Sequence, residues 1–418
     1  MKRIFPLFLS AWLCSQSVLG QNPFREHRYD GFSVLPVTEQ NIVFIGNSIT
    51  NMHEWWEAFG NPLVINRGVS GAVSDELLAH LTPIIKGQPA KAFLMIGTND
   101  LSRPGTVAHV AQNVRQAVQR FRMESPRTEV YVQSILPSRR RNLSEQRAAN
   151  DSLQAICREM GVKYIDLWHD LLSVAEDNQH TLDGLHLSAS GYRIWCQKIA
   201  PLVGTPSTYP REFADYASGL PTSNGMRASQ FPVLPVHDGD VLMIGDEMVH
   251  SGEWHELLRS DRVRSRSIGW GFPGIDIQDM RQCLPAIFAG RPDHGTPSKA
   301  FIYLGAADMQ QDSASVEKMV KCYEALLDEA HRLSPATRLV VGTVLPCGDE
   351  EKDRTLTVPF NQALVRLCKQ RPYVQVADIY TALTTNGQAN PKYMSGPYVS
   401  GQGYLRLAEL LRPMLVSK

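Results

Sequence analysis

Short, continuous apolar runs alternate with amphipathic segments along most of this chain. The runs NIVFIG, KAFLMIG and EVYVQSIL, which begin at Asn41, Lys91 and Glu129, are rich in Val, Ile and Phe and are ended by Gly or Pro. Such runs are typical of buried strands. Between them, segments 74–87 and 107–124 carry apolar residues at helical spacing. The alternation predicts an α/β fold in which helices cover both faces of a parallel sheet.

The same pattern occurs twice, in the same order. The stretch IVFIGNSITNMHEWWEAF (42–59) corresponds to VLMIGDEMVHSGEWHELL (241–258), and GQPAKAFLMIGTND (87–100) corresponds to GTPSKAFIYLGAAD (295–308). Three shorter pairs follow in order: TEVYVQSILP with TRLVVGTVLP, VKYIDLW with VQVADIY, and SASGY with SGQGY. A repeat of nearly half the chain indicates two tandem domains rather than a solenoid. We predict domains over 25–204 and 239–418, joined by a linker over 205–238 that is rich in Pro, Ser and Gly.

The first twenty residues differ from the rest of the chain. Lys2 and Arg3 precede an apolar region from Ile4 to Leu13, and small residues follow. This order predicts a secretory signal peptide over residues 1–20, and therefore export to the periplasm or the outside of the cell. Cys14 offers lipid anchoring as an alternative, although the bulky residues before it fit a lipoprotein cleavage site poorly.

Composition narrows the possible partners. The chain has 418 residues, of which 43% are hydrophobic, so two ordinary cores are possible. Lys+Arg and Asp+Glu both number 42, which gives no net field to attract nucleic acid or an anionic membrane. After the leader, no run is long enough to predict a membrane span. The remaining cysteines lack metal-ligand spacing, and we predict no metal. Export would permit disulfides, but buried core residues are the favoured interpretation of these cysteines. No cofactor is predicted.

Candidate chemistry gathers in the first repeat, at predicted strand ends. Ser48 lies in a tight turn after one strand, Asn99 follows another, and Gly71 follows the short run LVI. Asp183 and His186 lie three residues apart near the end of the unit. Ligands of open parallel sheets bind at the carboxyl ends of the strands, where these residues are expected to meet.

These residue types together fit nucleophilic catalysis. A serine nucleophile needs a base, and the base needs an acid that fixes its tautomer. His186 and Asp183 supply both, and the N–H groups of Ser48 and Gly71 with the Asn99 amide supply donors for an oxyanion. Each piece alone also fits an ordinary turn, polar loop or helix cap. Their occurrence in one order within one domain-sized unit is what indicates an active site.

The first repeat resembles the SGNH hydrolases, or GDSL-type esterases. The stretches that carry the resemblance are IGNSIT, NRGVSGAVSDELL, IGTND and DGLHLSASGY, and the second is similar to the branch that contains platelet-activating-factor acetylhydrolase. The resemblance covers residues 40–200. It implies a flavodoxin-like three-layer fold, a Ser48–His186–Asp183 triad, and an oxyanion hole from Ser48, Gly71 and Asn99. The chain departs from the family pattern in GNS for GDS and in Ala72, which leaves substrate choice open.

The second repeat lacks this chemistry. Ser48 corresponds to Glu247, while Asn99, Asp183 and His186 correspond to Ala307, Ser395 and Tyr398. Only Gly71 keeps its residue type, as Gly274. We therefore predict a degenerate second domain without an acyl-enzyme, in which Glu247 has no histidine beside it and no role in turnover. Trp270, Phe272 and Tyr398 are expected to line its former pocket, where they fill space or stack on a sugar.

The predicted function is an exported esterase that acts on short acyl groups. The exported setting and the lack of a long apolar lid segment favour acetyl. Relatives with this resemblance often deacetylate carbohydrate, including O-acetylated sialic acid. Arg139, Arg140 and Arg141 either hold a substrate carboxylate or form a solvated loop. The alternatives are a lipid or phospholipid acylhydrolase and a non-catalytic glycan-binding protein. The expected partners are a small-molecule or glycan ester and no nucleic acid, with the two domains packed on each other.

Overall fold

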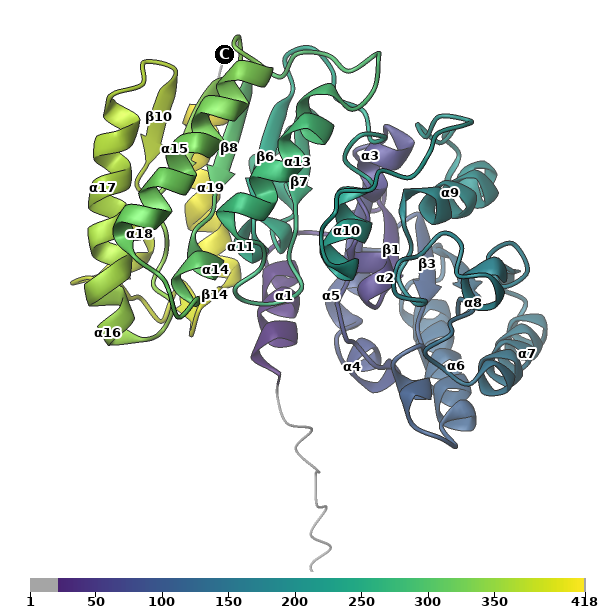
Figure 1. Ribbon diagram of the computed structural model, residues 1–418. Coiled ribbons are helices and arrows are strands. Elements are labelled where there is room, and N and C mark those ends of the chain that lie inside the picture. The colour runs from purple at the N-terminus through teal and green to yellow at the C-terminus, as the bar shows by residue number, and fades with distance from the viewer. Residues whose placement is uncertain (1–21, 417–418) are drawn as a thin grey trace, which may run out of the picture.

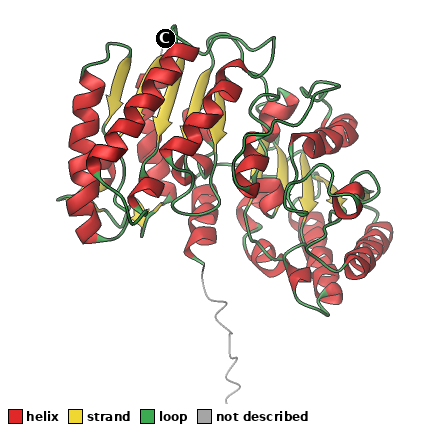
Figure 2. Cartoon of the chain, in the orientation of Figure 1, coloured by secondary structure: helices red, strands yellow, loops and turns green. Residues whose placement is uncertain are grey.

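The computed structural model describes residues 22–416 and contains two five-stranded parallel sheets, with helices on both faces of each (Figures 1 and 2). The α/β prediction with two tandem parallel sheets is confirmed. The predicted signal peptide over residues 1–20 and Cys14 lie outside the described residues. Strands β1 (Ile42–Gly46), β2 (Val64–Gly68), β3 (Lys91–Met95), β4 (Glu129–Gln133) and β5 (Lys163–Ile165) form the sheet of the first repeat.

From residue 22 onward, the first half of the chain contains ten helical elements. Leu77 and Phe121 come from two of them and pack with Val43 and Ile45 of β1 on one face of the sheet, whereas Phe44 packs on the other. The elements are α1 (Pro23–Ser33), α2 (Ser48–Asn51), α3 (Trp55–Phe59), α4 (Ser74–Ala79), α5 (Thr82–Lys86), the 3₁₀-helix η1 (Asp100–Ser102), α6 (Val107–Glu124), α7 (Leu143–Met160), α8 (Ser173–Glu176) and α9 (Ala189–Val203).

The second half repeats this order and adds two small hairpins near its end. Its sheet contains β6 (Val241–Gly245), β7 (Val263–Ser267), β8 (Lys299–Tyr303), β9 (Arg338–Gly342) and β10 (Val374–Ala377); the hairpins pair β11 (Thr384–Thr385) with β12 (Gln388–Ala389) and β13 (Met394–Ser395) with β14 (Tyr398–Val399). Its helices are α10 (Thr222–Ala228), α11 (Glu247–His250), α12 (Trp254–Leu258), α13 (Ile277–Ala289), α14 (Ala306–Met309), α15 (Val316–Leu333), α16 (Glu350–Lys352), the π-helix η2 (Asp353–Thr357), α17 (Val358–Lys369), α18 (Ile379–Leu383) and α19 (Gly401–Leu415).

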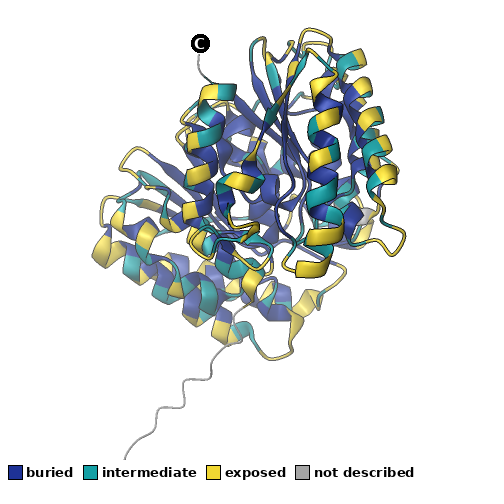
Figure 3. Ribbon diagram, turned by 90° about the vertical axis from the view of Figure 1, so that its left-hand side faces the viewer, coloured by how far each residue is buried: buried dark blue, intermediate teal, exposed yellow. Residues whose placement is uncertain are grey.

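Both sheets have the same topology and register. The strand orders are β2-β1-β3-β4-β5 and β7-β6-β8-β9-β10, which is the flavodoxin-like order with its switch point beside the first strand. Ile42 of β1 pairs with Val64 of β2, as Val241 of β6 pairs with Val263 of β7. All five residues of β1 are buried, as expected for a strand covered on both faces, and the exposed residues lie on the outer helix surfaces and the loops (Figure 3). Ligands of this topology bind at the carboxyl ends of β1 and β6.

Each repeat begins with a helix that packs on the other repeat. Helix α1 packs against α19, and the Gly401 N–H donates to Asp30 Oδ2 at 2.6 Å. Helix α10 is followed by Ser229, whose Oγ accepts from the N–H of Ala189 in α9 at 2.9 Å. In Figure 1, α1 lies beside the second sheet and α10 beside the first. The two repeats therefore exchange their first helices.

This exchange has a sequence signature outside the five matched pairs of stretches. Residues 28–37 read RYDGFSVLPV, and residues 227–236 read RASQFPVLPV. The second stretch lies within the segment that we predicted to be a linker. Arg227 and Phe231 are buried in the domain interface, so this segment packs as tightly as a core element. The predicted domain limits themselves stay a prediction.

Buried ion pairs join the repeats in a pseudo-twofold arrangement. Arg67 of β2 forms two hydrogen bonds with Glu256 of α12, at 2.8 and 2.7 Å. The equivalent pair, Arg266 of β7 and Glu57 of α3, lies 2.8 Å apart, and neither side chain is exposed to solvent. Each repeat thus gives one arginine and one glutamate to the other, as in an isologous dimer interface.

A second set of buried ion pairs involves the exchanged helices. Arg28 of α1 binds Glu253 and the carbonyl oxygen of Ser251 in the second repeat. Arg227 of α10 binds Glu54 and the carbonyl oxygen of Met52 at the equivalent place in the first. Removing one partner of such a pair leaves a charge that is buried and unpaired, so the repeats are expected to unfold together.

We predict that Glu57→Ala lowers the free energy of unfolding by about 3–5 kcal/mol, because the Arg266 guanidinium then remains buried without its counter-charge. Chemical denaturation followed by circular dichroism measures the change. The matched control is Glu39→Ala, which breaks the solvent-exposed pair with Arg127 and should cost less than about 1 kcal/mol. Equal losses in the two variants would contradict the structural role of the buried pair.

Candidate active site

Ser48 begins α2 directly after β1, in a turn that the local sequence fixes. The Asn47 side chain caps the helix by accepting from the Ile49 N–H at 3.0 Å. A Cβ on Gly46 would lie 2.3 Å from Thr50 Oγ1 and 2.5 Å from the Met95 carbonyl oxygen, so only glycine fits there. The turn places Ser48 at the carboxyl edge of the first sheet, where its side chain is nearly buried.

Ser48, His186 and Asp183 form one hydrogen-bonded series. Ser48 Oγ lies 2.9 Å from His186 Nε2, and His186 Nδ1 lies 2.9 Å from Asp183 Oδ2. A carboxylate only accepts hydrogen bonds, so Nδ1 of His186 carries the proton and Nε2 is free to accept from the Ser48 hydroxyl. The structure therefore brings the three predicted residues together in the order that proton transfer requires.

Asp183 is held ionised. Burial disfavours its charge, but His186 and the N–H groups of Leu185 and His186 outweigh burial and lower the pKa of Asp183 to about 2. The exposed Arg140 also reaches the carboxylate, with Nη1 3.4 Å from Oδ2. A carboxylate in this state fixes the imidazole tautomer and stabilises an imidazolium. Arg141 is directed elsewhere, since its Nε donates to the Thr98 carbonyl oxygen at 2.8 Å.

The predicted oxyanion donors lie on loops beside Ser48. Gly71 has a φ of +80°, a left-handed conformation that favours glycine, and a Cβ there would lie 3.4 Å from Arg25 Nη1. Asn99 Nδ2 donates one hydrogen bond, to the Ala72 carbonyl oxygen at 2.9 Å, which leaves its second N–H available. Within residues 22–416, the N–H groups of Ser48 and Gly71 have no hydrogen-bond acceptor. Three donors are thus available near the serine.

A buried carboxylate joins the loops that carry these donors. Asp100 accepts from the Ser74 N–H at 3.0 Å and from the Ser74 hydroxyl at 2.6 Å. Asp100 directly follows Asn99, and Ser74 lies three residues after Gly71. This link fixes the loop after β3 against the loop after β2, and so fixes the two donor groups relative to each other.

Residues 44–194 match the family model described as the GDSL-like Lipase/Acylhydrolase family. The first repeat is a GDSL-like lipase/acylhydrolase domain. The match contains the whole hydrogen-bonded series from Ser48 to His186, together with Gly71 and Asn99. The predicted resemblance to GDSL-type esterases is confirmed. No match was found among curated proteins.

Solved structures of GDSL-like proteins resemble this chain over one repeat. A provisionally named platelet activating factor from Streptococcus pneumonia is 26% identical, covers 43% of this chain and 92% of its own, and gives a TM-score of 0.39. A GDSL-like lipase from Bacteroides thetaiotaomicron is 20% identical, covers 43% of this chain and 97% of its own, and gives a TM-score of 0.37. The acetyl xylan esterase AlAXEase is 17% identical, covers 39% of this chain and 99% of its own, and gives a TM-score of 0.34. Among the described residues, no helix is both long and apolar enough to span a membrane.

Outside the GDSL-like domain, the second repeat has Glu247 at the place of Ser48. Asp246 caps α11 by accepting from the Met248 N–H, as Asn47 caps α2. Gly274 has a φ of +82°, as Gly71 has +80°. The backbone of the site is thus preserved, while the residues that would transfer a proton differ.

Glu247 is buried and makes both hydrogen bonds and a charged contact. Its carboxylate accepts from the Ser251 hydroxyl and from the Gly271 N–H, the latter at 2.7 Å. His27 Nε2, on the exchanged helix α1, lies 3.9 Å from Glu247 Oε1. The expectation that no histidine lies beside Glu247 is therefore wrong. Sequence reasoning missed His27 because it lies 220 residues away and belongs to the other repeat's helix.

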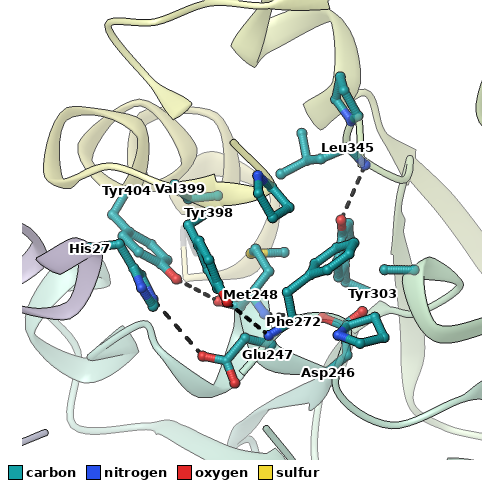
Figure 4. A pocket seen from close by; sticks show the side chains of 14 residues that line it. His27, Asp246, Glu247, Met248, Phe272, Tyr303, Leu345, Tyr398, Val399 and Tyr404 are labelled. Atoms are coloured by element: carbon teal, nitrogen blue, oxygen red, sulfur yellow. Dashed lines mark hydrogen bonds and ion pairs between the residues drawn. The ribbon is translucent and has the colours of Figure 1, made fainter. Parts of the chain in front are cut away.

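The former pocket of the second repeat is largely filled by aromatic side chains. Figure 4 shows Phe272, Tyr398 and Tyr404 around Glu247, with His27 beside them. His27 stacks on Tyr398, with ring centroids 4.5 Å apart. Phe272 and Tyr398 line this pocket as predicted, but Trp270 does not. Trp270 instead contacts His186 of the GDSL-like domain, with ring centroids 4.9 Å apart at 71°.

One group of side chains has the composition of a metal site. Glu253, His255 and Glu256 bring their ligand atoms within 4.8 Å of one another. Both carboxylates, however, are neutralised by guanidinium groups, Glu253 by Arg28 and Glu256 by Arg67. We therefore assign this group to the interface between the repeats.

We predict that Glu247→Gln stabilises the protein above neutral pH and not at low pH. Burial is the main cause that raises the pKa of Glu247 from 4.5 to about 7. Between these values the folded protein keeps a proton that the unfolded chain has released, so Glu247 lowers stability as pH rises through this window. His27 stays mostly neutral across this pH window, because burial lowers the pKa of His27 to about 4.

Glutamine has no charge to bury, so its advantage should grow from about zero near pH 4.5 to about 3 kcal/mol at pH 8. Denaturant unfolding of both proteins across this pH range measures the difference, and the titration of other groups cancels in the comparison. A difference that does not change with pH would contradict the role assigned to burial.

Proposed function

We propose that this protein is a serine esterase that hydrolyses short acyl esters, acetyl esters above all, through an acyl-enzyme on Ser48. The observation that carries the proposal is the series Ser48 Oγ, His186 and Asp183, linked by two contacts of 2.9 Å. The Asp183 carboxylate can only accept a hydrogen bond, so His186 Nδ1 keeps its proton and His186 Nε2 is left to take the proton of Ser48. A serine with this support is a nucleophile.

In the proposed mechanism, Ser48 Oγ attacks the ester carbonyl carbon while His186 Nε2 takes the hydroxyl proton. Asp183 stabilises the imidazolium that results. The N–H groups of Ser48 and Gly71 and the free N–H of Asn99 bind the oxyanion. His186 then gives its proton to the leaving alcohol. Water, activated by the same imidazole, hydrolyses the acyl-enzyme and restores Ser48.

The proposed substrate is an acetylated carbohydrate outside the cytoplasm. The leader-like sequence of residues 1–20 supports export, where extracellular glycans are available. The nearly buried Ser48 supports a small acyl group rather than a long chain. Rates across an acyl-chain series on one alcohol test this choice, with the highest rate expected for acetyl.

Ser48→Ala should abolish hydrolysis of 4-nitrophenyl acetate, since loss of a triad nucleophile lowers turnover on the order of a million-fold. A fluorophosphonate probe should label the parent protein at Ser48 and leave the variant unlabelled. Peptide mass spectrometry of the labelled protein identifies the modified serine. Hydrolysis by the variant at a rate near that of the parent would show that another group is the nucleophile.

Asn99→Ala should lower kcat on 4-nitrophenyl acetate about a hundred- to a thousand-fold, the usual effect of losing one oxyanion donor. Asn99 also donates to the Ala72 carbonyl oxygen, so thermal melting must be compared in parallel. Ser102→Ala, which removes a hydroxyl that binds the Asn99 carbonyl oxygen, is the matched control in the same loop and should cost little. A loss below about fivefold in Asn99→Ala would argue against an oxyanion role for its amide.

A further inference from the structure

The loop that follows β7 of the second repeat reaches the active site of the first. It contains residues 268–274, IGWGFPG, and we call it the β7 loop. Its Trp270 ring contacts the His186 ring, the base of the proposed triad, in an edge arrangement with centroids 4.9 Å apart. The second repeat therefore contributes a side chain to the surroundings of the first repeat's histidine.

Glu247 fixes the β7 loop on both sides of Trp270. A Cβ on Gly269 would lie 2.4 Å from Glu247 Oε2, so the loop crosses directly over this carboxylate. The Gly271 N–H donates to the same oxygen at 2.7 Å. The residue that replaces the nucleophile in the second repeat thus holds the two neighbours of Trp270.

Helix α1 supports the loop from the other side. A Cβ on Gly271, which has a φ of +116°, would lie 3.7 Å from the ring of Phe24. Arg25, the next residue, lies beside Gly71 of the proposed oxyanion hole. The exchanged helix therefore lies between the oxyanion loop and the β7 loop, and both ends of the site are bounded by residues outside the GDSL-like domain's own sheet.

The position of Trp270 next to His186 indicates which part of an ester it meets. The carbonyl oxygen must lie at the oxyanion donors, whereas the leaving oxygen must lie within hydrogen-bond reach of His186 Nε2. A side chain in contact with the imidazole therefore lies nearer the leaving alcohol than the carbonyl oxygen. An indole presents a large apolar face, on which the apolar face of a sugar ring can pack.

We propose that Trp270 is a specificity-determining residue that packs on the alcohol portion of the ester, a sugar ring, and that Glu247 is the positioning residue that holds it there. The inference rests on the proposed esterase function. It assigns the second repeat a role in substrate choice, and it replaces the expectation that Glu247 is irrelevant to turnover.

The test varies the alcohol while it keeps the acyl group constant. The ratio of kcat/KM for methyl 6-O-acetyl-glucopyranoside to kcat/KM for ethyl acetate should fall about tenfold or more in Trp270→Ala, because the sugar loses an aromatic surface that ethanol is too small to use. Trp270→Phe should keep most of the ratio. Its indole N–H is buried and has no acceptor among the described residues, so phenylalanine removes no hydrogen bond.

Glu247 is tested through the same ratio. Glu247→Ala should lower the sugar-ester to ethyl-acetate ratio because the Gly271 N–H loses its acceptor. Glu247→Gln should keep the ratio near that of the parent because an amide oxygen still accepts. A general loss of stability would lower the rates on both substrates and leave the ratio constant. An unchanged ratio in Trp270→Ala, or a change in acyl-chain preference instead, would overturn the proposal.

A binding measurement separates this inference from the esterase function. In the Ser48→Ala protein, calorimetry with methyl 6-O-acetyl-glucopyranoside should show binding that weakens about tenfold when Trp270→Ala is added. A parent protein that hydrolyses neither ester and takes no fluorophosphonate would contradict the esterase function. Loss of binding on Trp270→Ala would still support the role of the indole, and equal binding would overturn it.

Discussion

The structure depends on charged pairs that are buried where the two repeats meet. Arg266 and Glu57 have no solvent exposure, and Arg67 and Glu256 bind at the equivalent place with two hydrogen bonds. Charges buried in this way are costly unless both partners are present and aligned. The arginines of these pairs lie on β2 and β7, which are edge strands of the two sheets, so the interface also covers strands that would otherwise offer unpaired backbone groups to another chain. The repeats consequently have little freedom to move apart or to slide.

This fixed arrangement explains how one site is built from two repeats. Arg28 of α1 crosses to the second repeat and Arg227 of α10 crosses to the first, so neither repeat is complete without the other's first helix. Because α1 packs on the second repeat, Arg25 lies beside Gly71. Because the edge strands β2 and β7 face each other across the interface, Trp270 lies beside His186. The sheet of the first repeat provides the nucleophile and its base, while the boundary of the cleft comes from elements that belong to the interface.

Local sequence was sufficient to predict the sheets and the hydrogen-bonded series at Ser48. Runs such as IVFIG predict buried strands, and the spacing of Asp183 and His186 predicts a contact within one turn. The position of Trp270 was not predictable in this way, because its contact with His186 depends on how the repeats pack. The helix α10 was missed because Pro, Ser and Gly dominate its surroundings. A comparison of RYDGFSVLPV with RASQFPVLPV would have found it, since the two crossing helices have equivalent sequences.

The turn after the first strand of each sheet shows how one backbone supports two uses. In both repeats a capping residue and a short helix present the next side chain at the carboxyl edge of the sheet. Serine at this place is short and reaches only the histidine of its own repeat. Glutamate is longer by two carbons and carries two acceptor oxygens, so it reaches the Ser251 hydroxyl and the Gly271 N–H. Burial raises the pKa of Glu247 to about 7 because an enclosed carboxylate is costly to ionise, and the two hydrogen bonds offset part of that cost. The bond to Gly271 joins this turn to the loop that carries Trp270 to the active site of the other repeat.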